Sequence, residues 1–514
     1  MELTTREEAI DQLGARPFDV LVIGGGIIGA GIAATAARAG LGVALVDRGD
    51  FGGATSSASS KLIHGGLRYL RLGDVRLVRE AHQERRLLMR FVAPHLVRRL
   101  PFLLPLYREG PYGRATTEAG LLLYGVLARS RLHRLAPPER ARAQVPSLRL
   151  DGLRGCGVYA DATTHDGRLA LANIRAASAA GATVLNYAEV GELRIVGGRV
   201  AGANVIVDGN TVAVNARAVV NATGPWVDEI RRLEEPSASS TVRLSKGSHV
   251  LLRLDEPWSA ALTIPHDKVR VSFAVPWEGM LLLGTTDVLY EGPPGAVEAT
   301  EVEVAQILDE AAVAVAPELL RPDAICSTYA GLRVLPHGDG ETASARRETV
   351  FHRGTGGMLS VAGGKLTTYR RIALAVLDAL RSELGLSTVD RRPFQLPGGA
   401  AADLVARRLS ANRPELDSLV SSNLAHLYGN FAEDVLALGA EDPELLKPLH
   451  PAGPDIVAQV VYARDVEWAC RPEDVLRRRT TVALRGLADA KTVAVVEAVL
   501  HGDVRASGAH SSTT

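Results

Sequence analysis

The chain has 514 residues, 46% of them apolar and 4% aromatic, which is the composition of a globular protein of up to roughly three domains. Lysine plus arginine equals aspartate plus glutamate at 58 each, so net charge gives no sign of a nucleic-acid partner. The three cysteines lie far apart with no Cys/His cluster, which argues against a metal site and a disulfide framework and fits a reducing cytosol.

The acidic N-terminal stretch has no apolar core, so we expect no signal peptide. Residues 18–50 then predict a βαβ unit: a buried strand, a glycine-rich turn, a small-residue helix and a second strand. The turn reads Gly24-x-Gly26-x-x-Gly29, and Asp47 ends the second strand. In this context the pattern predicts dinucleotide binding, with the pyrophosphate at the helix N-terminus.

Each residue of this pattern has a physical role. Gly24 permits the tight turn, Gly26 lets the backbone approach a pyrophosphate, and Gly29 allows close packing of helix on strand. The Asp47 carboxylate can accept hydrogen bonds from a ribose diol.

Residues 68–135 are rich in arginine with apolar residues interleaved, and three prolines interrupt the helical spacing of the first half. Two interpretations stay open for this region. It forms core helices with solvated basic faces, or it forms a surface that lies on anionic lipid.

The rest of the chain alternates in type. We expect a helix over 166–180, strands and hairpins over 183–222 and 241–290, and a helix over 300–316. A strand, a Gly-Gly turn and a long helix follow at 358–384, then a linker at 391–400. Helical periodicity over 401–505 predicts a separate α-helical domain.

Two later segments favour FAD over NAD. One strand ends in the small residues Ala222, Thr223 and Gly224, which lets its backbone return to the nucleotide site. The other holds Gly364 and Thr367 at the start of the long helix, whose positive end suits an anionic reduced flavin. Three converging segments are typical of an FAD site.

The motifs IGGGIIGAGIA, ATSSASSKLIHGGLRYL, NATGPW, KGSH, GTTD, YAGLR and GGKLTTYR together resemble the FAD-dependent glycerol-3-phosphate dehydrogenases, most of all the bacterial aerobic, quinone-linked enzymes. The resemblance covers most of the chain. It implies an α/β plus α fold: a glutathione-reductase-like, Rossmann-type FAD-binding domain, an inserted β-rich substrate domain and a C-terminal helical domain.

The resemblance also implies domain bounds. We expect a first FAD-domain segment over 17–90 and the inserted domain over 91–390. The latter is interleaved with FAD-domain segments that return at about 150–245 and 345–390, and the helical domain covers 391–514.

The reaction implied is oxidation of sn-glycerol 3-phosphate to dihydroxyacetone phosphate, with hydride transfer to FAD and electrons passed to a membrane quinone. The implied protein is cytoplasmic, with peripheral contact at the inner face of the cell membrane, and we expect a homodimer.

The phosphate dianion requires fixed cations, and arginine forks suit it best. By resemblance the substrate pocket contains Arg68, Tyr69, Arg333, Arg347 and Lys365. A neighbouring arginine leaves the alignment of Arg347 open by one residue, and any single arginine can instead be a solvated surface charge.

The general base stays open between His64 and His249, because both lie in family motifs and a histidine can accept a proton near neutral pH. With Arg333 and Lys365 they form the expected catalytic set. We expect Thr55, Ser56 and Ser57 to bind cofactor phosphate, and His64 and Gly65 to pass beside the flavin.

Two other functions stay open on the sequence alone. An oxidase would use the same site with oxygen as acceptor, so the sequence discriminates poorly. A non-catalytic flavin-binding regulatory protein is disfavoured by the intact arginine, lysine and histidines. A related amine oxidase is a further alternative, which an amine substrate that bleached the flavin would reveal.

Overall fold

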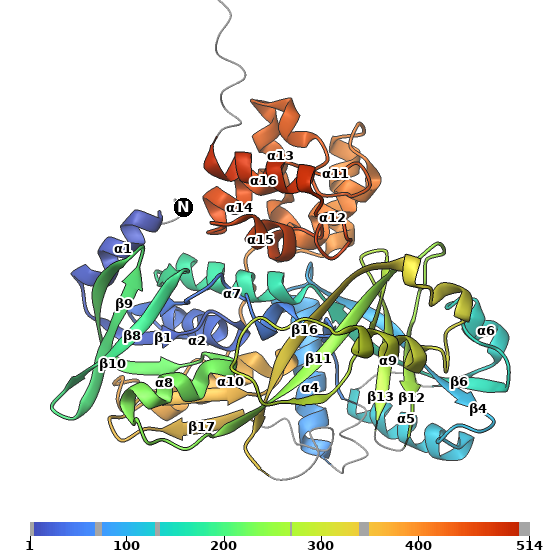
Figure 1. The fold of residues 1–514 in the computed structure, drawn as a ribbon, viewed down its shortest axis with the longest axis horizontal. Helices are drawn as coiled ribbons and strands as arrows, with labels where there is room; N and C mark the ends of the chain where they lie inside the picture. The colour runs from blue at the N-terminus through green and yellow to red at the C-terminus, as the bar shows by residue number, and fades with distance from the viewer. Residues whose placement is uncertain (1–4, 67–73, 129–133, 268–269, 339–348, 503–514) are drawn as a thin grey trace, which may run out of the picture. The chain divides into compact units, whose positions relative to one another are not determined.

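The computed structural model describes residues 5–66, 74–128, 134–267, 270–338 and 349–502. The chain divides into two compact units, Met1–Pro397 and Gly398–Thr514. Figure 1 shows two β-sheets with their helices in the first unit, and helices in the second. The expected interleaved domain bounds stay a prediction.

The first sheet carries the predicted βαβ unit. Its order is β17-β18-β10-β1-β2-β7, with β8 and β9 continuing from β10. Strand β1 pairs in parallel with both β2 and β10, and β18 continues the parallel run beyond β10. The strands are β1 Phe18–Ile23, β2 Val43–Val46, β7 Thr183–Leu185, β8 Ala188–Val196, β9 Arg199–Val207, β10 Asn210–Asn221, β17 Thr349–Arg353 and β18 Leu359–Gly363.

Helix α2 (Ile27–Arg38) lies between α7 (Asp166–Ala179) and α10 (Tyr369–Leu380). Small residues make this packing possible, since a Cβ on Gly31 would lie 2.7 Å from the Tyr369 ring. Helix α1 (Arg6–Ala15) and strands β8–β10 contribute side chains to one hydrophobic cluster. Helix α8 (Val227–Glu234) contacts β10 and β18. The parallel strands are therefore covered on both faces, as their continuous apolar sequences require.

The second sheet is mostly antiparallel, in the order β15-β11-β14-β13-β12-β4-β6-β3, with β16 on β11 and β5 on β6. Its strands come from two stretches of the chain, which alternate with the three stretches that form the first sheet. They are β3 Leu62–Ile63, β4 Val97–Tyr107, β5 Arg134–Ala136, β6 Leu153–Thr164, β11 Val242–Arg253, β12 Ala261–Pro265, β13 Val271–Trp277, β14 Met280–Gly284, β15 Val288–Tyr290 and β16 Ile325–Pro336.

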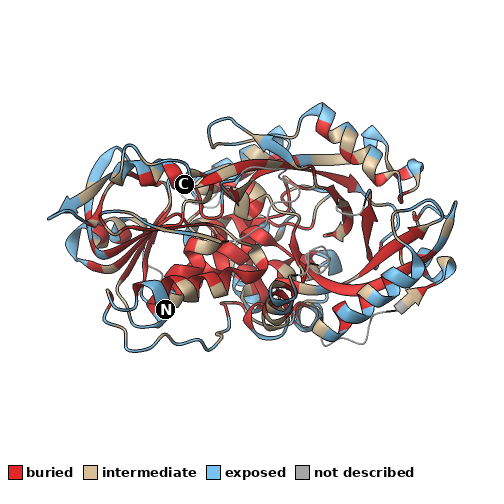
Figure 2. Ribbon diagram, turned by 90° about the horizontal axis from the view of Figure 1, so that it is seen from below, coloured by how far each residue is buried: buried red, intermediate tan, exposed pale blue. Residues whose placement is uncertain are grey.

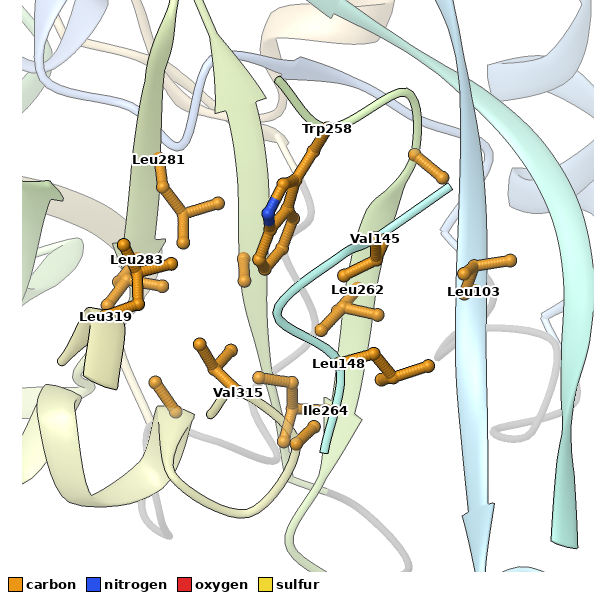
Figure 3. Close-up of a cluster of buried hydrophobic side chains, with 14 of the residues drawn as sticks. Leu103, Val145, Leu148, Trp258, Leu262, Ile264, Leu281, Leu283, Val315 and Leu319 are labelled. Atoms are coloured by element: carbon orange, nitrogen blue, oxygen red, sulfur yellow. The ribbon is translucent and has the colours of Figure 1, made fainter. Parts of the chain in front are cut away.

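Helices α6 (Pro138–Arg142) and α9 (Glu301–Ala311) help cover this sheet. Between them and the strands lies a hydrophobic cluster in which Trp258 packs among leucine, isoleucine and valine side chains (Figure 3). Figure 2 shows the same pattern over the whole unit, with buried strands and helices that present exposed outer faces. Helices α4 (Val75–Leu87) and α5 (Arg114–Ala128) contact each other, and α5 also packs on β6.

Strand β4 was not anticipated, because its prolines read as helix breakers. Pro101 and Pro105 both lie within β4, opposite Ala160 and Cys156 of β6. The ladder shifts register directly after Pro105, and β12 pairs with β4 only at two positions. A strand tolerates proline where its ladder is interrupted in this way.

The second unit is helical, as its periodicity predicted. Its helices are α11 Ala402–Asn412, α12 Ser418–Tyr428, α13 Ala432–Ala437, α14 Ala458–Val466, α15 Pro472–Asp474 and α16 Ala490–His501, and they enclose two hydrophobic clusters. Asp455 is buried there and accepts hydrogen bonds from Thr481 and Asn423. Within the described ranges, every helix of the chain is too short or too polar to span a bilayer.

Candidate active site

The glycine turn after β1 is closely packed. Gly24 has φ +104°, and a Cβ there would lie 2.7 Å from the carbonyl oxygen of Ala222, at the end of β10. A Cβ on Gly29 would lie 1.9 Å from the carbonyl oxygen of Gly24. Both positions therefore exclude every other residue. Gly26 is the N-cap residue before α2 and makes no side-chain capping hydrogen bond.

Asp47 follows β2 at the same edge of the sheet. Its carboxylate accepts the backbone N–H groups of Gly25 at 2.6 Å and Gly49 at 2.8 Å. Burial raises the pKa of Asp47 to about 6, although both backbone hydrogen bonds oppose the shift. A carboxylate at this position can accept hydrogen bonds from the hydroxyl groups of a ribose.

The three hydroxyls expected on cofactor phosphate all have partners within the protein. Ser56 Oγ accepts the Ile27 N–H at 2.9 Å, at the N-terminus of α2. Thr55 donates to the carbonyl oxygen of Leu332 at 2.6 Å, and Ser57 donates to that of Ala54 at 3.3 Å. Only Ser56 therefore contacts the helix terminus at which the pyrophosphate is expected.

The small residues after β10 adjoin the glycine turn. Ala222 is buried and its N–H donates to the carbonyl oxygen of Ile23 at 2.8 Å. Thr223 donates to the Asn221 side chain at 2.7 Å, and Gly224 follows with φ +58°. The strand end thus returns to the nucleotide turn, as the segment's composition suggested.

The chain around His64 contacts the start of α10. The backbone N–H of His64 donates to Thr367 Oγ1 at 3.2 Å, and the same hydroxyl lies 3.4 Å from the His64 carbonyl oxygen. Lys365 and Gly364 directly precede this turn and are partly buried. The structure therefore brings together His64, Gly65 and the Gly-Gly-Lys segment.

His249 lies on β11 and is 2% exposed. Its Nε2 is 2.9 Å from Ser60 Oγ, and its ring stacks on Tyr329 with 4.7 Å between centroids. The buried Nδ1 has no hydrogen-bond partner among the described residues. Burial lowers the pKa of His249 well below 6.5, and the cations Arg333 and Lys61 lower it further while Asp166 opposes them.

Arg333 projects from the neighbouring strand β16. It donates to Thr285 Oγ1 at 2.6 Å and to the Thr286 carbonyl oxygen at 3.0 Å, with Asp287 at 3.6 Å. A Cβ on Gly247 would lie 2.1 Å from the guanidinium, so glycine there makes room for it. The guanidinium is therefore held in one orientation by two neutral acceptors and by the Asp287 carboxylate.

Segment 55–65 links these parts. Ser56 contacts the N-terminus of α2, Ser60 contacts His249, and His64 contacts Thr367. Along the way Thr55 and Tyr329 tie the segment to β16, since the Tyr329 hydroxyl donates to the Ser59 carbonyl oxygen at 2.6 Å. The nucleotide turn and both candidate bases thus meet along one short stretch.

Two buried carboxylates of this site escaped the sequence analysis. Asp166 pairs with Lys61 at 2.7 Å, and Asp161 pairs with Arg85. The signal available was the spacing of the two aspartates in YADATTHD, but their cations lie far away in the sequence. The predicted residues Arg68, Tyr69 and Arg347 lie outside the described residues.

These residues fit FAD. The glycine turn excludes side chains, Asp47 stands at the second strand, and small residues at 222–224 and 363–364 border the same edge of the sheet. Among the described residues, no group of three or more His, Cys, Asp or Glu is arranged to hold a metal ion.

Comparison with known proteins agrees with this fit. Residues 19–370 match the family model described as FAD dependent oxidoreductase, and residues 392–503 match the C-terminal domain of alpha-glycerophosphate oxidase. The chain is 36% identical to the glycerol-3-phosphate dehydrogenase of Mycobacterium leprae, over 97% of this chain and 87% of that one. It is 32% identical to the aerobic glycerol-3-phosphate dehydrogenase of Staphylococcus haemolyticus, over 93% and 90%.

The solved structures agree as well. The glycerol-3-phosphate dehydrogenase from Bacillus halodurans, complexed with FAD, superposes with a TM-score of 0.75 at 27% identity, over 96% of each chain. The expected fold class, enzyme class and FAD cofactor are confirmed by these matches. The chain belongs to the FAD-dependent oxidoreductases and, among them, to the glycerol-3-phosphate dehydrogenase family.

Proposed function

We propose that this chain oxidises sn-glycerol 3-phosphate to dihydroxyacetone phosphate and delivers the electrons to a membrane quinone. The observation that carries the proposal is segment 55–65, which connects the nucleotide turn at Ser56 with His249 at Ser60. When bound, FAD supplies the hydride acceptor. The protein supplies a phosphate-binding cation, a proton acceptor and a rigid wall between them.

Arg333 is the cation with the strongest support. Its orientation is fixed by Thr285 and Thr286, and its side chain keeps 17% of its surface exposed, so it can meet a dianion without large rearrangement. Lys365 adds a second charge at the turn before α10. We also predict that the proposed pocket includes Arg68, Tyr69 and Arg347, as the sequence indicates.

His249 is the better supported proton acceptor. Burial beside two cations keeps its imidazole neutral, and a neutral ring can accept the hydroxyl proton of the substrate. Ser60 orients the ring through Nε2. His64 remains the second candidate, because Thr367 fixes its backbone beside the turn that begins α10.

The test is anaerobic addition of glycerol 3-phosphate to the purified yellow holoprotein. We expect the flavin absorbance to bleach. Arg333→Met should raise KM by about tenfold to a hundredfold, because one charged hydrogen-bonding partner is worth about 1.5–3 kcal/mol. Arg199→Met, on an exposed side chain of β9, is the matched control. A wild-type flavin that stays oxidised would overturn the proposal, and bleaching by an amine would favour amine oxidation.

Oxygen is the second candidate acceptor, since the C-terminal residues match a domain of alpha-glycerophosphate oxidase. Hydrogen peroxide yield during turnover, compared with reduction of a soluble quinone, separates the two. Stoichiometric peroxide with no quinone reduction would favour the oxidase.

Peripheral contact with the membrane is supported by α5. Its inner face buries Leu121 and Tyr124, while Leu122, Leu123 and Val126 are exposed at 67%, 46% and 67%. We propose that this outer face, with the arginine-rich chain around it, lies on anionic lipid, where quinone dissolves.

Sedimentation with anionic vesicles tests the contact. Leu122→Glu should release the protein, whereas Leu419→Glu, at an equally exposed leucine of α12, should leave binding unchanged. Equal binding of both variants would contradict the assignment to α5.

Light scattering of the purified protein tests the expected homodimer.

A further inference from the structure

A buried carboxylate lies directly behind the chain at His64. Asp161, on β6, is 3% exposed, and it accepts the backbone N–H of Gly65 at 3.0 Å. Tyr124 of α5 donates its hydroxyl to the same carboxylate at 2.9 Å, and Arg85 of α4 forms an ion pair with it. Arg85 also donates to the carbonyl oxygen of Ala160 at 2.7 Å, so the guanidinium is itself fixed.

The peptide between His64 and Gly65 is held from two sides. Asp161 takes its N–H, and the Thr367 hydroxyl lies 3.4 Å from its carbonyl oxygen. The Gly65 Cα packs on the His82 ring so closely that a Cβ would lie 2.2 Å from it. This peptide therefore cannot tilt or shift without breaking a buried contact.

A second carboxylate fixes the other end of the same stretch. Asp166 accepts the backbone N–H of Ser59 at 3.0 Å and its hydroxyl at 2.7 Å, and it pairs with Lys61. Between the two anchors, β3 pairs with β6 through Leu62–Thr163 and Ile63–Ala162. Residues 59–63 are therefore fixed by contacts other than Asp161, and Asp161 holds the backbone at Gly65.

We propose that Asp161, oriented by Arg85 and Tyr124, is a positioning residue that fixes the His64–Gly65 peptide beside the flavin. The inference rests on the proposed function, which sets His64 and Gly65 in the wall of the site. Asp161 itself lies behind the backbone, so it acts through Gly65 and not on the substrate.

Burial and the surrounding donors act in opposite directions on the pKa of the Asp161 carboxyl group. Burial raises the pKa of Asp161, whereas Arg85 and the hydrogen bonds from Gly65 and Tyr124 oppose that shift. The carboxylate accepts from three donors, the Gly65 N–H, Arg85 of α4 and Tyr124 of α5, so the two helices hold in place the group that accepts from Gly65.

Two buried tyrosines provide a matched test. Tyr124→Phe removes a hydroxyl from Asp161 and leaves no unpaired charge. Tyr159→Phe, on β6 itself, removes a buried hydroxyl that contacts Thr263 instead. The holoproteins are compared in three measurements: thermal unfolding, hydrogen exchange of a peptide that covers Gly65, and the limiting rate of anaerobic flavin reduction by glycerol 3-phosphate. Asp161→Asn is a stronger variant that can fail to fold, because it leaves Arg85 unpaired.

We expect both phenylalanine variants to lose similar thermal stability. Only Tyr124→Phe should speed exchange at Gly65 and slow limiting flavin reduction, each on the order of tenfold, with KM unchanged, because a loosened reacting geometry lowers kcat. Equal exchange and equal reduction in the two variants would overturn the inference. Wild-type flavin that glycerol 3-phosphate does not reduce would instead refute the proposed function, and the exchange comparison would still decide the role of Asp161.

Discussion

The buried Lys61–Asp166 pair offers the sharpest prediction, which concerns Lys61→Met. Both side chains are 1% exposed and their charged atoms are 2.7 Å apart. Methionine has a similar length, so its side chain can fill the space over the Trp277 ring, where the ammonium lies 4.9 Å from the centroid. The substitution therefore removes the charge and leaves the Asp166 carboxylate buried without its cation.

The expected loss follows from that geometry. Removing one partner of a buried ion pair costs about 3–5 kcal/mol, because an uncompensated charge stays behind. With an unfolding entropy of about 2.1 cal/mol/K per residue over the unit that ends at Pro397, a loss of about 4 kcal/mol lowers Tm by about 5 °C. Lys61→Met combined with Asp166→Asn should recover most of this loss, since no charge then remains.

The pH dependence has a definite sign. In the native protein burial alone raises the pKa of Asp166, but Lys61 and the Ser59 hydroxyl outweigh it and hold that pKa below its ordinary value. The pair then contributes stability above the unfolded pKa of the carboxyl, and this stability is lost as pH falls through the folded pKa. In Lys61→Met the largest contribution that opposes burial is lost and only weaker ones such as the Ser59 hydroxyl remain. The pKa of Asp166 therefore rises, and the carboxylate destabilises the fold at neutral pH.

Scanning calorimetry of the holoproteins at pH 7 and pH 5, at equal FAD concentration, measures both effects. The gap in Tm between wild type and Lys61→Met should narrow at the lower pH, where the stranded carboxyl takes up a proton. A gap that is independent of pH, or a double variant no more stable than the single one, would refute this reasoning.

Three further predictions concern cofactor and proton acceptor. Gly29→Ala should abolish FAD retention, because its Cβ would lie 1.9 Å from a backbone oxygen. Gly120→Ala is the control, since a Cβ there meets open space. The flavin absorbance of the two purified proteins should therefore differ. Asp47→Asn should weaken FAD binding by roughly tenfold to a hundredfold through loss of a charged acceptor, measured by fluorescence titration of the apoprotein. His249→Gln should slow flavin reduction by about 10²–10⁴-fold. In the wild type the acid limb of kcat/KM should lie below pH 6.5, because burial lowers the pKa of His249, and a limb above 6.5 would exclude this base.

The sequence by itself determined those elements whose pattern is local. The βαβ unit is readable because buried parallel strands are continuously apolar and a glycine turn has no substitute, and β1, α2 and β2 formed where the pattern predicted. Helix α10, after the Gly-Gly turn at 363–364, and the helical C-terminal unit could also be predicted, because the hydrophobic periodicity of each is local.

Only the tertiary structure decided the partners. Strand β4 holds two prolines that favour a break, yet pairing with β6 overrides them along most of its length. Thr55 and Ser57 carry hydroxyl groups of the kind that bind phosphate. In the structure these hydroxyls instead donate hydrogen bonds to backbone carbonyl oxygens.

The buried carboxylates were least accessible to sequence reasoning. Asp161 and Asp166 meet cations 76 and 105 positions away in the sequence, and nothing in a single chain's local pattern marks such a pair. A charge becomes stable inside a protein only when folding has assembled its counter-ion and donors, so its role is a property of the assembled site.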